Sequence, residues 1–411
     1  MKKIELLAPA GDLNKLKTAI DYGADAVYLG GEAFGLRKAS KNFPIEEMEK
    51  GVEYAHERGK FVHVTLNIIP HEDDMEGIEE YLQDLERIGV DAVIVADPGM
   101  FSRVKKACNI PIHMSTQGSL TSSDSVKFWA DLGAERAVLA RELSLEEIKK
   151  IVEKVGNEIE IETFLHGAMC MSYSGRCLLS NYMTGRDANR GDCSQACRYK
   201  YHLVEESRPG EYYPIVQEDE GSFILNSKDL CMIEHVDELI EAGISSLKIE
   251  GRVKSEYYLA TVVRSYRMAI DAYYADPENY QYDPKYLEEI QKVSHRDFTT
   301  GFYYGEAKGP EGIYERKSYV RNYDFMGIVL DYDEETQIAT IEQRNRVFVG
   351  EEVEFFGPGK EHFTQKIEWM KDENGEEIEV APRARMIYTM KVDRPVAPKD
   401  MLRKKVEEDE K

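Results

Sequence analysis

The sequence predicts a TIM-type (β/α)8 barrel with an insertion after its seventh strand, followed by a small C-terminal β-barrel domain. Between residues 4 and 252, eight short β-rich runs alternate with longer amphipathic stretches. About eighty residues separate the seventh run from the eighth, where about thirty are usual for one β-α unit. Residues 320 to 395 alternate apolar and polar side chains in short runs. Because an open doubly wound sheet rarely contains eight regular repeats, we favour the closed barrel.

Each expected barrel strand is a short run rich in apolar and β-branched residues, bounded by turn residues. In chain order the eight runs are Ile4–Ala8, Ala26–Gly30, Phe61–Asn67, Ala92–Ala96, Ile110–Ser115, Ala137–Arg141, Ile159–Leu165 and Ser246–Glu250.

The expected helices are marked by apolar residues at helical spacing and by start signals. The first includes Leu13, Leu16, Ala19 and Ile20, and the second includes Ile45, Met48, Val52 and Ala55. We expect Pro44 at the first helical position of the second helix. Ser144 and Glu147 have the spacing of a capping box, so the sixth helix should begin there. The segment Ser255–Tyr274 reads as the closing helix of the barrel.

The remaining segments complete the expected domain organisation. The insertion begins with a cysteine-rich window, residues 162–201, continues through the acidic stretch Glu205–Gly221 and ends in an amphipathic helix before strand eight. We read the polar, tyrosine-rich residues 276–319 as an irregular connection. The last residues, RKKVEEDEK, are expected to be disordered. The predicted divisions are a barrel at 1–275 with the insertion at 166–235, a connection at 276–319, a β-barrel domain at 320–400 and a tail at 401–411.

The net charge of the chain limits its anionic partners, and the amino-terminal sequence bears on its cellular compartment. A formal net charge of −24 argues against sequence-blind attraction to nucleic acid or anionic lipid. An anionic partner would need a local basic patch, and Arg186, Arg190 and Arg198 in the cysteine window could form one. A solvated loop would show the same charges. The start of the chain lacks the pattern of a signal peptide, and no apolar run is long enough to cross a membrane, so we expect a cytoplasmic protein.

The cysteine window points to a metal site. The sequence has no HExxH, GxSxG or Walker motif, and no GxGxxG follows a strand. Four of the six cysteines, Cys170, Cys177, Cys193 and Cys197, lie within this window. Four thiolates can hold a 4Fe-4S cluster or a structural zinc ion, and the wide first spacing favours the cluster. Ordinary buried cysteines are a third reading. Cys231 follows the same insertion and is an alternative ligand.

Polar residues gather at the carboxyl ends of the expected strands. Period two places His63, Thr65 and Asn67 on one face of strand three, and the barrel lumen satisfies polar groups better than the helix layer. A packed, hydrogen-bonded histidine is an equal reading of His63. Any single polar residue at a strand end could be a cap or a salt bridge, but their joint placement favours a pocket. As catalytic candidates we take His63, Asn67, Glu162, His166 and Glu250. As substrate-binding candidates we take Arg37, Gln117, Arg141, Arg252, Arg186, Arg190 and Arg198.

Several motifs together resemble the collagenase-like peptidase family. They are Glu162-x-Phe164-x-x-Gly167-Ala168-x-Cys170, Ser174-Gly175-Arg176-Cys177-x-x-Ser180, the opening LLAPAGDLNKLKTAIDYGADAVYLGG, LNSKDL at 225–230 and SLKIEGR at 246–252. They lie at separate points of the expected fold in the family's order, and the length and β-rich end extend the resemblance to the whole chain. Within the family, TGRDANRGDCSQACRYKY at 184–201 is most similar to the branch that hydroxylates the tRNA wobble uridine.

The resemblance implies an RNA-modifying function. Other branches of this family act in hydroxylation of a ribosomal RNA cytidine and of the ubiquinone ring. The family pattern implies a 4Fe-4S cluster on Cys170, Cys177, Cys193 and Cys197, with Cys231 as the alternative ligand, and prephenate as a small anionic cosubstrate. The implied partners are tRNA and, in addition, a paralogous subunit of the family. A peptidase is the rival reading, although no nucleophile–base pair is evident. A non-catalytic metal scaffold that docks a partner is a third.

Overall fold

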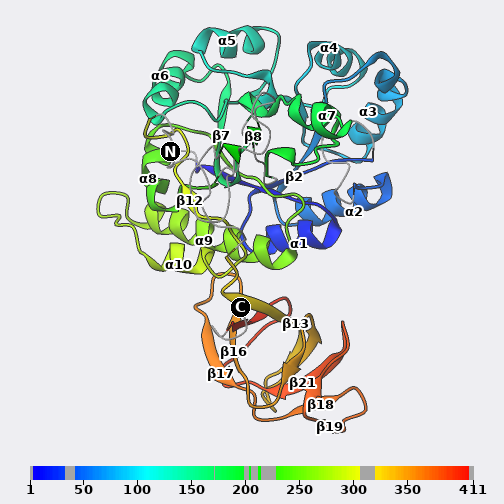
Figure 1. Ribbon diagram of the computed structural model, residues 1–411, viewed down its shortest axis with the longest axis vertical. Helices are drawn as coiled ribbons and strands as arrows, with labels where there is room; N and C mark the ends of the chain where they lie inside the picture. Colours follow the sequence, from blue (N-terminus) through cyan, green and yellow to red (C-terminus); the bar gives the residue numbers. More distant parts are fainter. Residues whose placement is uncertain are drawn as a thin grey trace.

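A computed structural model describes residues 3–32, 42–170, 172–198, 203–204, 212–213, 228–305 and 320–406 of the chain. Arg37 and most of the acidic stretch 205–221 lie outside these ranges. Figure 1 shows a barrel surrounded by helices, with a smaller β-domain below it that is coloured orange to red. No helix in these ranges combines the length and the apolar character needed to cross a bilayer.

The barrel is closed, and all eight predicted strands form it. Neighbouring strands pair in parallel in chain order, and the last barrel strand pairs with both the seventh and the first. The barrel strands are β1 (Glu5–Pro9), β2 (Ala26–Leu29), β3 (Phe61–Leu66), β4 (Ala92–Val95), β5 (Ile112–Met114), β6 (Arg136–Val138), β7 (Glu160–Ala168) and β11 (Ser246–Ile249).

Helices follow the strands and bury their apolar faces against the outside of the barrel. They are α1 (Leu13–Asp21), α2 (Ile45–His56), α3 (Ile78–Arg87), α4 (Pro98–Ala107), α5 (Ser123–Asp131), α6 (Leu145–Val155), α8 (Val236–Glu241) and α9 (Glu256–Ala275). The predicted capping box is present, because the Ser144 amide donates to Glu147 Oε2 at 2.8 Å and the Glu147 amide donates back to Ser144 Oγ at 3.4 Å. Pro44 is the N-cap of α2, one residue before the position we predicted.

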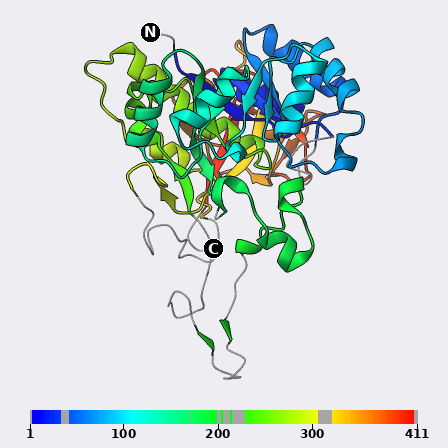
Figure 2. The ribbon, with the colours of Figure 1, turned by 90° about the horizontal axis from the view of Figure 1, so that it is seen from above.

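The described part of the insertion consists of short elements above one end of the barrel. They are the 3₁₀ turns η3 (Tyr173–Gly175), η4 (Ala188–Arg190) and η5 (Ala196–Arg198), helix α7 (Leu179–Thr184), and the paired strands β8 (Leu203–Val204) and β9 (Tyr212–Tyr213). In Figure 2 the green helical part of the insertion projects beyond the helices of the barrel. A 3₁₀ turn, η1 (Glu72–Met75), follows β3, and another, η2 (Thr116–Gly118), follows β5.

The structure adds four elements between β9 and the C-terminal domain that the sequence did not predict. Strand β10 (Asp229–Cys231) pairs antiparallel with the end of β7 and is followed by the turn η6 (Ile233–His235). The connection after the barrel contains α10 (Lys285–Ile290) and β12 (Phe298–Thr299), which pairs with β10. The described part of this connection is therefore more ordered than the irregular segment we expected. Strands of two or three residues are too short to show a period and are specified by their pairing partners.

The C-terminal domain is an antiparallel sheet curled into a half-barrel around its own apolar core. Its main sheet runs in the order β17-β16-β22-β13-β14-β21-β18-β19. The strands of the domain are β13 (Tyr323–Asp333), β14 (Ile338–Gln343), β15 (Val347–Phe348), β16 (Glu352–Phe356), β17 (Phe363–Lys366), β18 (Met370–Asp372), β19 (Glu377–Ile378), β20 (Val380–Ala381), β21 (Ile387–Lys391) and β22 (Met401–Lys405).

The predicted disordered tail is wrong for residues 403–406. Strand β22 lies in the middle of the sheet, between β16 and β13, and the Arg403 side chain is fully buried. A run of charged residues usually indicates a solvated end, but here Glu289 and Glu354 compensate the charge of Arg403. The domain therefore extends beyond the predicted boundary at residue 400.

Candidate functional site

A cavity of about 970 Å³ opens at the carboxyl ends of the barrel strands. TIM barrels carry their active sites at this end. Four described parts of the chain form the cavity walls: the ends of the barrel strands with the segments that follow them, the cysteine-bearing insertion, residues 293–294 of the connection after the barrel, and the beginning of the C-terminal domain. The predicted insertion after strand seven therefore does lie at the barrel mouth, where it narrows access to the lumen.

The four cysteines of the insertion all line this cavity. Cys170 and Cys193 are exposed and Cys177 and Cys197 are half-buried, and no disulfide joins any of the six cysteines, all of which lie in described ranges. A pair of hydrogen bonds fixes the backbone at Cys177: its amide donates to Asn189 Oδ1 at 3.0 Å and Asn189 Nδ2 donates to its carbonyl at 2.9 Å. The loop is thus held by side-chain bonds rather than by regular structure.

Further hydrogen bonds fix the segments on either side of the cysteines. The Ser174 amide donates to Glu142 Oε1 at 2.6 Å, which ties the insertion to the loop after β6. The Ser194 amide donates to Ser180 Oγ at 2.9 Å, so the residue after Cys193 is tied to α7. These contacts hold the four thiols over the barrel mouth.

Cys231, the predicted alternative ligand, lies apart from the other four. It is buried in β10, outside the cavity lining, with its thiol 3.6 Å from the Tyr266 hydroxyl. Burial raises the pKa of the Cys231 thiol to about 11, so the thiolate needed by a metal is disfavoured there.

His63 and Glu162 lie below the cavity, in the barrel floor, and line no part of it. The His63 ring packs edge-on against His113, with centroids 4.8 Å apart, and burial lowers the pKa of both imidazoles. Glu162 is completely buried and accepts from Lys248 Nζ at 2.8 Å and Arg136 Nη1 at 3.1 Å. Burial alone would raise the pKa of Glu162, but Lys248 and Arg136 hold it below its usual value. The predicted position of His63 and Glu162 at the barrel mouth, as catalytic residues, is therefore wrong.

We expect Glu162→Gln to lower the free energy of unfolding by about 2 kcal/mol, because Lys248 and Arg136 would lose a charged acceptor in the barrel floor. Urea unfolding measures the change. Glu158→Gln is the control, since Glu158 is exposed and its ion pair with Lys127 is a surface contact of 3.5 Å. Equal unfolding midpoints for the two variants would contradict the expectation.

His166 also lies away from the cavity, which corrects its predicted place at the mouth. Its Nδ1 is 3.2 Å from the Tyr266 hydroxyl, and its ring packs beside Tyr258 and Phe298 on the outside of the barrel. The pairing of β7 with β11 shifts register here, from Phe164 opposite Lys248 to His166 opposite Ile249. This irregularity turns His166 out of phase with Glu162 and Phe164. Burial lowers the pKa of His166 to about 3.

Besides the four cysteines, five of the described catalytic and substrate-binding candidates line the cavity, and hydrogen bonds hold each of them. Asn67 Nδ2 donates to Gln117 Oε1 at 2.9 Å. Arg252, which is 4% exposed, donates to Thr65 Oγ1 at 3.1 Å. Glu250 accepts from the Tyr28 hydroxyl at 3.0 Å and from the Gly251 amide at 2.7 Å. Arg141 donates from Nη1 to the Ala168 carbonyl at 3.1 Å.

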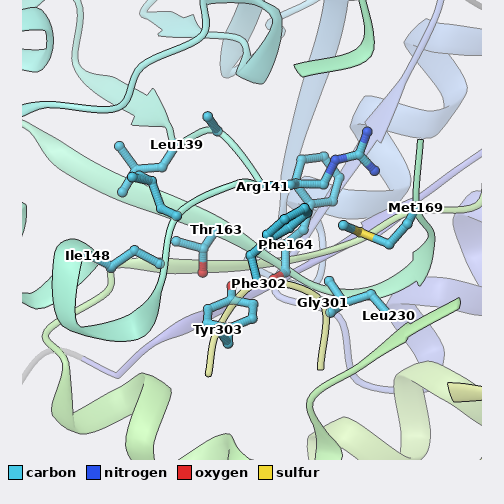
Figure 3. Close-up of a pocket in the computed structure, with 12 residues that line it drawn as sticks. Leu139, Arg141, Ile148, Thr163, Phe164, Met169, Leu230, Gly301, Phe302 and Tyr303 are labelled. Carbon is cyan, nitrogen blue, oxygen red and sulfur yellow. Dashed lines mark hydrogen bonds between the residues drawn. The ribbon is translucent and has the colours of Figure 1, made fainter. Parts of the chain in front are cut away.

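Arg141 also separates the main cavity from a small one behind it. Figure 3 shows Arg141, Phe164 and Met169 beside the apolar side chains of this second space, whose volume of about 10 Å³ can hold at most one water molecule. The Arg141 guanidinium lies 4.9 Å from the centroid of the Phe164 ring, a cation–π contact that orients it. The small space is a packing gap rather than a second ligand site.

The sequence reasoning missed Lys248, Lys254 and Arg321, which also line the cavity. Period two would have found Lys248, because it alternates with Glu250 and Arg252 in the SLKIEGR motif. With Arg141 and Arg252, these residues make five cationic side chains among the described residues of the lining, which include one carboxylate, Glu250. Glu162 compensates the charge of Lys248, and the other four cations still outnumber Glu250, so this described lining is locally cationic in a chain with a net charge of −24.

The predicted basic patch of the insertion is partly neutralised. Arg186 donates from Nε to Asp192 at 2.8 Å, and Arg190 donates from Nε to Asp74, on η1, at 2.9 Å. The side chain of Arg198 and the whole of Arg37 lie outside the described residues. Arg176 of the insertion is outside the cavity lining, and its Nε donates to the carbonyl of Gln117, a lining residue, at 2.8 Å.

Comparisons with known proteins agree with the two-domain architecture. Residues 11–311 of the chain match peptidase family U32, and residues 321–403 match the peptidase family U32 C-terminal domain. It is 48% identical to tRNA hydroxylation protein P1 of Bacillus subtilis, over 98% of this chain and 95% of that protein. It is 36% identical to tRNA hydroxylation protein P of Escherichia coli, over 93% of this chain and 92% of that protein.

A third relative carries a different name. The chain is 38% identical to an uncharacterized protease of Methanocaldococcus jannaschii, over 94% of this chain and 95% of that protein. The matches therefore cover both domains in bacterial and archaeal proteins. The chain belongs to peptidase family U32, with that family's C-terminal domain.

Proposed function

We propose that this protein takes part in tRNA modification by hydroxylating carbon five of the wobble uridine. One observation of the structure carries the proposal: four cysteines and five cationic side chains line the same cavity at the barrel mouth. The relatives named tRNA hydroxylation proteins align with nearly the whole chain, which supports the same reaction class. Enzymes that act on a base take it out of the stack, and a cavity of about 970 Å³ has room for an extruded nucleotide.

The residues suited to a cluster are Cys170, Cys177, Cys193 and Cys197. All four line one cavity wall, two of them are exposed, and a 4Fe-4S cluster takes four thiolate ligands. When bound, such a cluster would supply electron transfer or Lewis-acid chemistry. Zinc is the alternative occupant, because it also accepts four thiolates. The buried thiol of Cys231, whose pKa is raised to about 11, fits either metal less well.

The inner cations of the cavity are suited to a small anionic cosubstrate, for which we propose prephenate. Arg252 is nearly buried and is oriented by Thr65, and Arg141 is oriented by the Ala168 carbonyl and the Phe164 ring. A guanidinium group can hold a carboxylate through two parallel hydrogen bonds. Two oriented guanidinium groups would therefore select a dicarboxylate over a neutral molecule of the same size.

A peptidase is the alternative, and the family name and the archaeal relative are in its favour. Serine and cysteine peptidases activate their nucleophile with an adjacent base, usually histidine. Among the described residues, no histidine lines the cavity. His63, His113 and His166 are buried elsewhere and their pKa values are lowered by burial. The cavity therefore supports RNA modification better than peptide hydrolysis.

Deletion of the gene is expected to remove 5-hydroxyuridine and its derivatives from tRNA, and the intact gene should restore them. Mass spectrometry of nucleosides from purified tRNA measures both. The test strain must lack paralogous family members, since a paralogue could replace the missing activity. Unchanged levels in such a strain would refute the proposal. Digestion of gelatin by the purified protein, lost on substitution of one cavity residue, would favour the peptidase instead.

A further inference from the structure

We propose that the C-terminal domain forms part of the active site and that Arg321 binds a backbone phosphate of the RNA beside the modified uridine. This inference rests on the proposed function. Arg321, Tyr323 and Phe325, at the beginning of the C-terminal domain, line the same cavity as the four cysteines. The domain is therefore a wall of the site rather than a separate module attached to the barrel.

Packing against the barrel fixes the position of this wall. The Phe325 ring stacks on Tyr257 of α9, with centroids 5.2 Å apart and planes 5° from parallel. The Tyr257 hydroxyl donates to the Lys292 carbonyl at 2.8 Å, which joins the stack to the segment after α10. The Arg344 guanidinium lies 6.0 Å from the centroid of Phe325. Phe325 is therefore a positioning residue that holds the start of β13 against the barrel.

Arg321 differs from the other cations of the cavity in its exposure. Its side chain is 61% exposed, and its Nη2 pairs with Asp324 at 2.7 Å. Arg252 and Lys248, in contrast, are 4% and 5% exposed. A guanidinium has five N–H donors, so one contact with Asp324 leaves donors for a further anion. Exposure at the rim suits a polymer that reaches the cavity from outside, whereas the buried cations suit a small molecule within it.

RNA geometry determines which group Arg321 should meet. When a nucleotide is extruded into a pocket, its base moves inward while the flanking phosphates stay with the strand outside. Phosphate contacts position a nucleic acid without reading its sequence. The rim cation is therefore assigned to a flanking phosphate, whereas Arg252 and Lys248 lie deeper, on the side of the base and the cosubstrate.

The test is a binding titration with the full-length protein and a fluorescently labelled anticodon stem-loop that has uridine at the wobble position. Fluorescence anisotropy at several salt concentrations gives the affinity and its salt dependence. We expect Arg321→Ala to weaken binding about tenfold and to lower the slope of log Kd against log salt by about 0.7 to 0.9, the effect of one lost phosphate contact. Arg321→Lys should recover most of the affinity, because a phosphate accepts either cation.

Arg383→Ala is the matched control. Arg383 is an exposed arginine of the same domain outside the cavity lining. Its positive charge interacts electrostatically with Asp372 of β18. In Figure 1 this strand lies at the end of the domain that is far from the barrel. We expect the Arg383→Ala variant to bind the stem-loop with the affinity and the salt slope of the wild type.

The outcomes separate the two proposals. If the wild-type protein binds no stem-loop and gene deletion leaves tRNA unchanged, the proposed function fails. If the wild type binds but Arg321→Ala and Arg383→Ala have the same affinity and salt slope, the role of Arg321 is refuted while the function stands. Loss of affinity in Arg321→Ala, with recovery in Arg321→Lys, supports the inference.

Discussion

Cys177→Ser is expected to abolish tRNA hydroxylation, with a loss of at least about 100-fold, and to remove most of the iron and the charge-transfer absorption of the anaerobically purified protein. Serine keeps the size of the side chain but offers no thiolate. The fold should be retained, because Asn189 fixes this position through the Cys177 backbone rather than through its sulfur. Nucleoside mass spectrometry, iron and zinc content, and circular dichroism measure the three effects.

Substitutions of three other cysteines provide a control and identify the fourth ligand. Cys108→Ser alters a half-buried thiol at the end of α4 that donates to the Val104 carbonyl, outside the cavity lining, and should leave activity and metal content unchanged. The iron content of Cys231→Ala and of Cys197→Ser shows which of these two cysteines is the fourth ligand. If Cys231→Ala removes the iron while Cys197→Ser retains it, our assignment of Cys197 is wrong. Zinc instead of iron in the wild type would overturn the choice of cofactor.

The barrel could be predicted because each strand and each helix leaves its own pattern in the sequence. A parallel strand covered on both faces appears as a short apolar run, and the following helix appears as an apolar stripe. Once eight such units are counted, barrel geometry brings the carboxyl ends of the strands to one mouth. This is why Asn67, Gln117, Arg141, Glu250 and Arg252 could be placed in one cavity although they are far apart in the sequence.

The depth of a residue along the barrel could not be predicted in the same way. Period two shows which face a side chain takes but not how far below the mouth it lies, so His63 and Glu162 were placed too high. His166 was placed on the wrong face, because one irregularity in the pairing of β7 with β11 reverses the alternation after Phe164. Such a shift depends on two strands far apart in the sequence and leaves no local signal.

The link between the domains was also invisible in the sequence, because its charged residues come from distant segments. Arg403 of β22 and Arg264 of α9 both contact Glu289 of α10, with nitrogen–oxygen distances of 2.7 and 3.0 Å. Lys292 Nζ lies 2.7 Å from Glu289 and 3.1 Å from Glu354 of β16. Burial would raise the pKa of Glu289, but His362, Arg403 and Lys292 hold it well below its usual value. The barrel and the C-terminal domain thus share one buried ionic cluster.

This cluster lies directly beside the cavity. Val293 and Ser294, which follow Lys292, line the cavity, and the Tyr323 ring lies 5.4 Å from Lys292 Nζ and 5.7 Å from the Arg403 guanidinium. The contacts that join the domains therefore also determine where the C-terminal wall of the site lies. Loss of one charged member should loosen this wall as well as destabilise the fold.

Arg403→Met is accordingly expected to lower the free energy of unfolding of the C-terminal domain by about 3–5 kcal/mol, because it leaves two buried carboxylates with one cation fewer. Of the two tryptophans, Trp129 lies in the barrel and Trp369 in the C-terminal domain. In a Trp129→Phe background, the fluorescence of Trp369 therefore follows the unfolding of this domain in urea. Arg383→Met, a change at the surface, should leave the transition within about 0.5 kcal/mol of the parent. Equal midpoints for the two variants would mean that the cluster contributes little, and that the apolar contacts between α9 and the sheet suffice to hold the domain against the barrel.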